Sequence, residues 1–202
     1  YELLDDGTVS IIKYIGNDKD VSIPSAIDGK IVTKIGEFAF RRNNNLVSVE
    51  IPEGVTAIDY GAFRECESLT NVKLPNSITS IGEAAFRNCS SLTNVTIPEC
   101  VTVLGEESFK GCVGFTSVTI PRSVTEIGDE AFGYFYNDGD KKIEGYIIYG
   151  YAGTAAEQYA TENGFKFVEA DSEYEYNFLD NGTISITKYK GTDTDISIPS
   201  EI

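Results

Sequence analysis

The chain has 202 residues, of which 32 are acidic and 16 basic, and its formal net charge at pH 7 is −16. Such a surface repels polyanions, which disfavours nucleic acid as a partner. The sequence contains no His, Met or Trp. Without His it lacks the commonest general base and the commonest metal ligand, so we expect no enzymatic activity, no cofactor and no metal site.

The first 20 residues predict an antiparallel hairpin. Apolar and polar residues alternate on both sides of Asp6-Gly7, and an Asp-Gly pair favours a tight turn between two strands. We assign residues 1–20 to a cap that covers the first coil of the repeat that follows.

From residue 21 to about residue 150 the sequence repeats every 23 residues. The stretch SLTNVKLP at 68–75 returns as SLTNVTIP at 91–98. The repeat is clearest in one aromatic column, formed by Phe40, Phe63, Phe86, Phe109 and Phe132. A unit this short cannot bury its own apolar face, so successive units must stack as coils. The sequence therefore predicts an α/β solenoid, dominated by strands, of about five 23-residue coils.

One unit reads LxxVxIPxxVTxIGxxAFxxCxx. The segment VxI alternates apolar and polar residues, which is typical of a strand with one buried face. Proline ends that strand because it cannot donate a ladder hydrogen bond. VTxI predicts a second short extended segment, and GxxAFxxC a compact turn, which we expect to be one helical turn with Ala and Phe facing inward.

The C-terminal side of the array departs from the repeat. After Phe132 the register slips by five residues around YNDGD. Thr154 and Glu157 then form a predicted capping box, and Gly164 a helix stop, which together predict a helix over roughly 155–163. With the strand FKFV that follows, residues 151–170 form a predicted C-terminal cap, so that one repeat domain spans 1–170.

A second, longer repeat follows. Residues 176–202 copy residues 1–27 at an offset of 175, with 17 identities. We interpret 171–202 as a linker and the start of a second, truncated array. The hypothesis is a longer protein whose arrays pack end to end, with a hairpin at 178–189.

The 23-residue unit resembles the leucine-rich repeat of BspA-type (Treponema-type) surface proteins, LxxIxIPxxVxxIGxxAFxxC. The resemblance covers residues 21 to about 150, with four clean units and a degenerate fifth. It implies a curved right-handed solenoid and a cell-surface or secreted location in host-associated bacteria. It carries no catalytic residue to this chain.

Two sets of residues are candidates for binding. The first is a column of cations, which could hold sulfated or sialylated glycans or only balance the turn dipoles; its members are Arg41, Arg64, Arg87 and Lys110. The second is the aromatic run Tyr134, Phe135 and Tyr136, at least one of which we expect to be exposed, since three consecutive rings cannot all face inward. Replacing Tyr134 and Tyr136 should then leave stability nearly unchanged.

Other columns have less specific readings. Cys66, Cys89 and Cys112 are expected to be small buried side chains, and Cys100 an exposed thiol. Asn137, Asp138 and Asp140 resemble a fragment of a calcium loop but lack the Glu and the spacing of a full site.

These observations favour a non-enzymatic binding or adhesion module of a bacterial surface or secreted protein, which recognises a protein or glycan of a host or neighbouring cell. The alternative is a structural spacer that presents another domain, favoured by the regular repeat and by small polar outward residues. We expect an extracellular monomer. No membrane insertion is expected in this segment, because no apolar run reaches the ~18 residues that a span requires.

Overall fold

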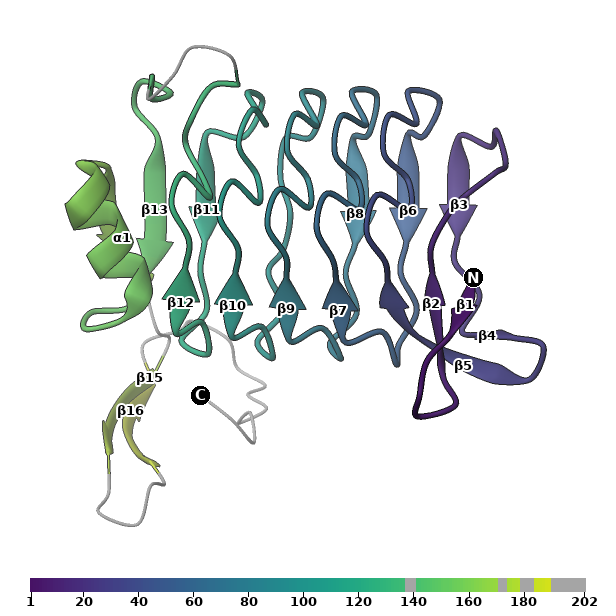
Figure 1. Ribbon diagram of the computed structural model, residues 1–202. Coiled ribbons are helices and arrows are strands. Elements are labelled where there is room, and N and C mark those ends of the chain that lie inside the picture. Colours follow the sequence, from purple (N-terminus) through teal and green to yellow (C-terminus); the bar gives the residue numbers. More distant parts are fainter. Residues whose placement is uncertain (137–140, 171–173, 179–183, 190–202) are drawn as a thin grey trace. The chain divides into compact units, whose positions relative to one another are not determined.

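The computed structural model describes residues 1–136, 141–170, 174–178 and 184–189 (Figure 1). The chain divides into two compact units, Tyr1–Glu169 and Ala170–Ile202. The first unit is a solenoid in which most coils contribute one short strand to each of two sheet faces. The predicted solenoid is therefore confirmed, with little helix.

The VTxI segments form the first sheet, which we call the continuous sheet. Its parallel rungs are β2 (Val9–Ile11), β5 (Lys30–Ile35), β7 (Ala57–Ile58), β9 (Ser80–Ile81), β10 (Val103–Leu104) and β12 (Glu126–Ile127). From β7 to β12, neighbouring rungs pair residues 23 positions apart, such as Ile58 with Ile81. These six rungs are more than the about five coils that we predicted.

The VxI segments form the second sheet, which we call the interrupted sheet. Its first part is β3 (Asp20–Ser22), β6 (Ser48–Glu50) and β8 (Asn71–Lys73), and its second part is β11 (Ser117–Thr119), β13 (Ile147–Gly150) and β14 (Lys166–Glu169). All of these pairings are parallel. The coil between β8 and β11 carries no strand at this position (Figure 1).

The core contains a continuous stack of aromatic rings. Phe63, Phe86 and Phe109 are at most 1% exposed, and successive ring centroids in this column lie 5.1 Å apart. The spacing is close to the ~4.8 Å between hydrogen-bonded strands, so one ring fits each coil. Tyr14 stacks on Phe40 at one end of the column, and Tyr159 meets the edge of Phe132 at the other.

The turns that carry these rings are not helical, contrary to our prediction. Each turn holds two residues with positive φ, as at Phe38 (56°) and Arg42 (60°) in one coil and at Ala84 (53°) and Asn88 (60°) in another. The N–H groups of Phe40 and Phe63 donate to Ala62 O and Ala85 O of the next coil, at 2.7 and 2.8 Å. Bonds between coils therefore satisfy backbone groups that a helix would satisfy internally.

The N-terminal cap agrees with its prediction. β1 (Glu2–Leu3) pairs antiparallel with β2, and Gly7 adopts a φ of 84° in the turn between them. A second small hairpin, β4 (Ala26–Ile27) with β5, follows in the next coil.

The C-terminal cap contains α1 (Ala155–Asn163), and Gly164 ends it with a φ of 64°, as predicted. The prediction of a capping box is wrong in detail. The Thr154 side chain makes no cap hydrogen bond and instead donates to Tyr151 O at 2.6 Å, while Glu157 accepts from the Gly153 N–H at 2.8 Å. The FKFV segment is strand β14, as expected.

The second unit contains a hairpin of β15 (Tyr174–Phe178) and β16 (Ile184–Tyr189). Asn177 pairs with Ser185 and Phe178 with Ile184, which is the register of Glu2 with Ser10 and Leu3 with Val9 shifted by 175 residues. The sequence duplication is thus also a duplication of backbone structure. The turn at 179–183 lies outside the described residues.

Candidate functional site

The interrupted sheet opens at residues 94–97. Elsewhere in it, backbone bonds join successive coils, as between the Ile51 N–H and Lys73 O at 3.1 Å or the Ile120 N–H and Tyr149 O at 2.9 Å. Across the described part of the chain, no backbone hydrogen bond joins residues 94–97 to β8 or to β11. This coil therefore stays in the stack through its other segments, including β10.

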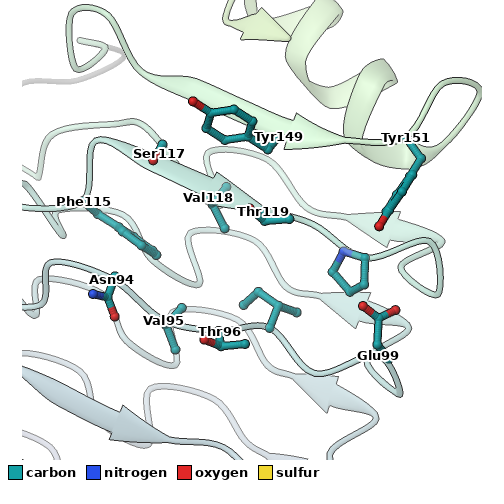
Figure 2. A pocket seen from close by; sticks show the side chains of 12 residues that line it. Asn94, Val95, Thr96, Glu99, Phe115, Ser117, Val118, Thr119, Tyr149 and Tyr151 are labelled. Atoms are coloured by element: carbon teal, nitrogen blue, oxygen red, sulfur yellow. The ribbon is translucent and has the colours of Figure 1, made fainter. Parts of the chain in front are cut away.

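A hollow of about 370 Å³ lies at this opening; we call it the sheet groove. Figure 2 shows that side chains from neighbouring coils converge on it. Its lining is Asn94, Val95, Thr96, Ile97, Glu99, Phe115, Ser117, Val118, Thr119, Pro121, Tyr149 and Tyr151. Val95, Phe115 and Val118 are buried and form an apolar floor, while Asn94, Thr96 and Thr119 are exposed at the rim.

One side chain beside the opening departs from the repeat. Phe115 occupies the position that Leu46, Leu69 and Leu92 hold in other coils. It is 2% exposed, and its ring centroid lies 6.0 Å from that of Phe109 and 6.2 Å from that of Phe132. Because a larger side chain in a close-packed stack displaces its neighbours, we expect Phe115 to contribute to the loss of strand pairing at residues 94–97.

The groove offers two kinds of contact. In a parallel strand, the backbone groups of alternate residues point to opposite edges. Because β11 pairs with β13 on one side, the N–H and C=O groups on its other edge face residues 94–97 without a strand partner among the described residues. Tyr149, Tyr151 and the Glu99 carboxylate supply aromatic and anionic contacts, and Arg122 lies 4.1 Å from the Tyr151 ring centroid. This arrangement can bind an extended segment; it contains no nucleophile with an adjacent base.

The predicted column of cations is neutralised by carboxylates that the sequence reading did not identify as partners. Arg64 pairs with Glu65 at 3.1 Å, and Arg41 approaches the same carboxylate at 3.9 Å. Arg87 pairs with Glu107 at 2.5 Å. Lys110 lies between Glu107, at 2.9 Å, and Glu130. The pairs Arg41–Glu65, Arg87–Glu107 and Lys110–Glu130 cross from one coil to the next, while Arg64–Glu65 and Lys110–Glu107 lie within one coil. The column is therefore a ladder of ion pairs along the turns and not a free cationic stripe.

The aromatic run divides into a buried and a partly exposed part. Tyr134 is 5% exposed, donates a hydrogen bond to Asn163 of α1 and meets Phe165 edge to face at 5.6 Å. Our expectation that Tyr134 could be replaced without loss of stability is therefore wrong, because its ring packs under the C-terminal cap. Phe135 and Tyr136 are half-buried; the Arg87 guanidinium lies 4.8 Å from the Tyr136 ring centroid.

The cysteine column is confirmed as core. Cys66, Cys89 and Cys112 are buried and free, and Cys100 is exposed. Each buried thiol donates to the carbonyl of a Phe of the column, as Cys66 does to Phe40 O at 3.0 Å. Burial raises the pKa of the Cys66 and Cys112 thiols to about 12, which makes them unreactive at neutral pH.

Two kinds of feature are absent from the part of the chain that the structure describes. No group of three or more Cys, Asp or Glu side chains is arranged to hold a metal ion, and no helix has the length and apolarity of a membrane span. Asn137, Asp138 and Asp140 lie outside the described residues.

The fold and the repeat agree with known proteins. The sequence-family model of the BspA type leucine rich repeat region matches residues 15–137 of this chain in six copies. A leucine rich repeat protein of T. pallidum is 31% identical, with a TM-score of 0.66, over 74% of this chain and 67% of that chain. A leucine-rich repeat protein of Bacteroides ovatus is 28% identical, with a TM-score of 0.57, over 75% and 48%.

A further solved structure shares the fold alone. The pneumococcal vaccine antigen PcpA is 19% identical, with a TM-score of 0.60, over 81% of this chain and 44% of that chain. The chain thus spans less than half of this protein and of the Bacteroides ovatus protein. A search of curated proteins finds no significant match. The six matched repeats, which cover more than half of the sequence, show that the chain belongs to the BspA-type leucine-rich repeat family.

Proposed function

We propose that this chain is a non-enzymatic binding module of a bacterial surface or secreted protein, and that it binds an extended segment of a macromolecule from a host or neighbouring cell in the sheet groove. The observation that carries the proposal is the opening at 94–97, where strand edges lie beside an apolar floor and two tyrosines. An extracellular location follows from the resemblance to surface proteins and is part of the proposal.

An extended peptide fits these features best. It could pair with the open edge of β11 by strand addition, in which backbone hydrogen bonds provide affinity and pockets for alternate side chains provide specificity. Tyrosine supplies large contact areas at low entropic cost. The net charge of −16 and the Glu99 carboxylate favour a neutral or basic segment over an acidic one.

The structural spacer remains a second candidate, and one observation favours it. The cations that could have formed a glycan-binding stripe are paired with Glu65, Glu107 and Glu130. A surface whose charges are already compensated between coils serves the stability of the rod. A spacer would have no ligand of its own.

The test is a binding screen followed by a matched pair of variants. The chain is applied to arrays of extracellular-matrix proteins, peptides and glycans, and each ligand found is tested against Asn94→Arg and Asn71→Arg. Both positions are exposed asparagines of equivalent repeats, but Asn94 lines the groove whereas Asn71 lies in the paired strand β8.

We expect Asn94→Arg to abolish binding and Asn71→Arg to leave it unchanged. Equal effects of the two variants would place the ligand elsewhere on the sheet. If the unsubstituted chain binds no member of the arrays, the spacer becomes the better reading.

A further inference from the structure

The two ends of the solenoid leave the same sheet open. At the N-terminal end, β1 covers the edge of β2 in the continuous sheet, and at the C-terminal end α1 packs beside β12. α1 also contacts β13 and β14 of the interrupted sheet, but within the described ranges no further strand pairs with either end of that sheet. Among the described residues, β3 and β14 are its terminal strands, each paired on one side only.

Unpaired strand edges are templates for pairing with another chain, and proteins that avoid such pairing cover or charge their edges. Here β1 pairs with the N-terminal edge of the continuous sheet, whereas β3 and β14 have no strand partner on their outer edges among the described residues. Both edge strands run parallel to the interior strands of their sheet. A second copy placed along the solenoid axis would therefore bring β14 beside β3 in the parallel sense that the sheet already uses.

The registers within the sheet decide which residues would meet. Asp20 pairs with Ser48 and Val21 with Val49, and the same positions recur at the other end, where Ile147 pairs with Lys166 and Ile148 with Phe167. Continuing this register places Lys166 opposite Asp20 and Phe167 opposite Val21. The first is a pair of opposite charges and the second a pair of apolar side chains, both of which favour cross-strand contact.

The end faces around these strands are apolar. At the N-terminal end, Ile15 is 89% and Tyr1 50% exposed, beside a hollow of about 310 Å³ that Tyr14, Val21 and Phe40 help to line. Phe167 is half-buried in β14. Burial of such surface would add to the strand pairing.

The duplicated sequence keeps the residues of this edge. The copy at an offset of 175 has Asp195, Ile196 and Ser197 where β3 has Asp20, Val21 and Ser22, whereas Ile15 is replaced by Lys190. The order of the chain also places a copy of the N-terminal end after β14, which is the order that head-to-tail stacking requires.

We propose that β14 of one molecule pairs in parallel with β3 of a second copy of this chain, head to tail, so that the interrupted sheet continues from copy to copy. The contact is heterologous and does not close on itself, so it produces linear assemblies. Because each copy contributes one short strand pair and a small apolar face, association is weak and depends on concentration; dilute protein is monomeric.

Disulfide trapping tests the register in the full chain. Asp20→Cys and Lys166→Cys are made in separate chains in which Cys100 is replaced by Ser, and the two are mixed under mild oxidation. Directly opposed residues of paired strands lie about 5 Å apart, within the Cα separation that a disulfide spans. We expect a cross-linked heterodimer, while Glu169→Cys, three residues further along the same strand, should not cross-link to Asp20→Cys.

Charge exchange tests the same contact without cross-linking. Asp20→Lys and Lys166→Glu should each weaken self-association about two- to tenfold, as expected for one cross-strand charge pair, and the double variant should restore it. Sedimentation equilibrium measures the association constants, and far-UV circular dichroism verifies folding of each variant.

Three results would overturn the proposal. The first is a chain that stays monomeric at millimolar concentration and forms no cross-link. The second is equal cross-linking through residue 169, which indicates random collision. The third is a preferred cross-link within one chain between Lys166→Cys and Asp195→Cys, which would show that the chain's own second N-terminal segment, and not another molecule, occupies β14.

Discussion

The continuous and the interrupted sheet are built from the same 23-residue repeat, yet only one of them opens. The continuous sheet joins β2 to β12 through parallel pairs, whereas the interrupted sheet loses its pairing on both sides of residues 94–97. One sequence difference lies beside the opening: in the Leu column, which directly precedes the VxI strands, Phe115 replaces Leu in the coil that follows residues 94–97. We expect this larger side chain to contribute to the loss of pairing.

The comparison teaches that a solenoid can open a groove without an insertion. Each coil is joined to its neighbours through two sheets and through the turns, so one connection can be lost while the others maintain the stack. A change of size within a regular column is a weaker sequence signal than an inserted loop.

The largest expected effect comes from breaking both sheets together. Phe86→Ala would leave a cavity between Phe63 and Phe109, on which Phe86 stacks. We expect a loss of about 3–5 kcal/mol in the free energy of unfolding, measured by urea denaturation. Val113→Ala, at a residue that is 42% exposed, is the control and should cost at most about 0.5 kcal/mol. Similar losses of unfolding free energy in the two variants would mean that the aromatic column does not stabilise the stacked coils.

A smaller effect is expected at the turns, which support both sheets. The Lys110 side chain is 10% exposed and lies between Glu107 and Glu130. Its replacement by Met removes the cation from Glu130 and leaves Glu107 with Arg87 alone, at a cost of about 1–3 kcal/mol, between the values of exposed and buried pairs. Lys73→Met breaks the exposed pair with Glu50, whose side chains are 71% and 49% exposed, and should cost less than about 1 kcal/mol. If Lys73→Met lost more stability than Lys110→Met, the ion pairs at the turns would not be the more stabilising ones.

Closing the groove is the direct way to remove the difference between the sheets. Phe115→Leu restores the side chain of the other coils and should change stability by less than about 1.5 kcal/mol. Hydrogen exchange at residues 94–97 and 117–119 should slow, because strand pairing protects backbone amides, and ligand binding in the groove should fall. Unchanged exchange at these residues would show that Phe115 is not the cause of the opening.

The smallest expected effect is a dependence on pH at the turns. The hydrogen bond from Arg42 lowers the pKa of Glu65 below its ordinary value of 4.5, against the opposing effect of partial burial. The ionised form is thus favoured in the folded state, so its contribution to stability is present above pH 4.5 and is lost as the pH falls through the lowered pKa.

Urea unfolding at pH 7 and at pH 3 measures this contribution. The stability difference between the unsubstituted chain and Glu65→Gln should shrink at the lower pH. The same comparison with Glu67→Gln, at an exposed position, should show little change. A difference for Glu65→Gln that is independent of pH would contradict the role of the ionised carboxylate.

Much of the fold could be predicted from the sequence because each position of the repeat occurs in several copies of the unit. The Phe column, the Cys column and the two extended segments follow from a spacing of 23 residues, and the helix over 155–163 from its residue pattern and the Gly164 stop. Local rules sufficed because each coil contacts only its neighbours.

Three features were decided by the tertiary structure. The turns are not helical, because left-handed residues such as Phe38 and Ala84 direct N–H groups to the next coil, a contact that exists only in the stack. The ion pairs Arg87–Glu107 and Lys110–Glu130 join residues of successive coils, which only stacking brings near. The sheet groove opens at residues 94–97, where Val95 and Ile97 keep the VxI pattern, so the loss of strand pairing there depends on packing between coils and not on the local pattern.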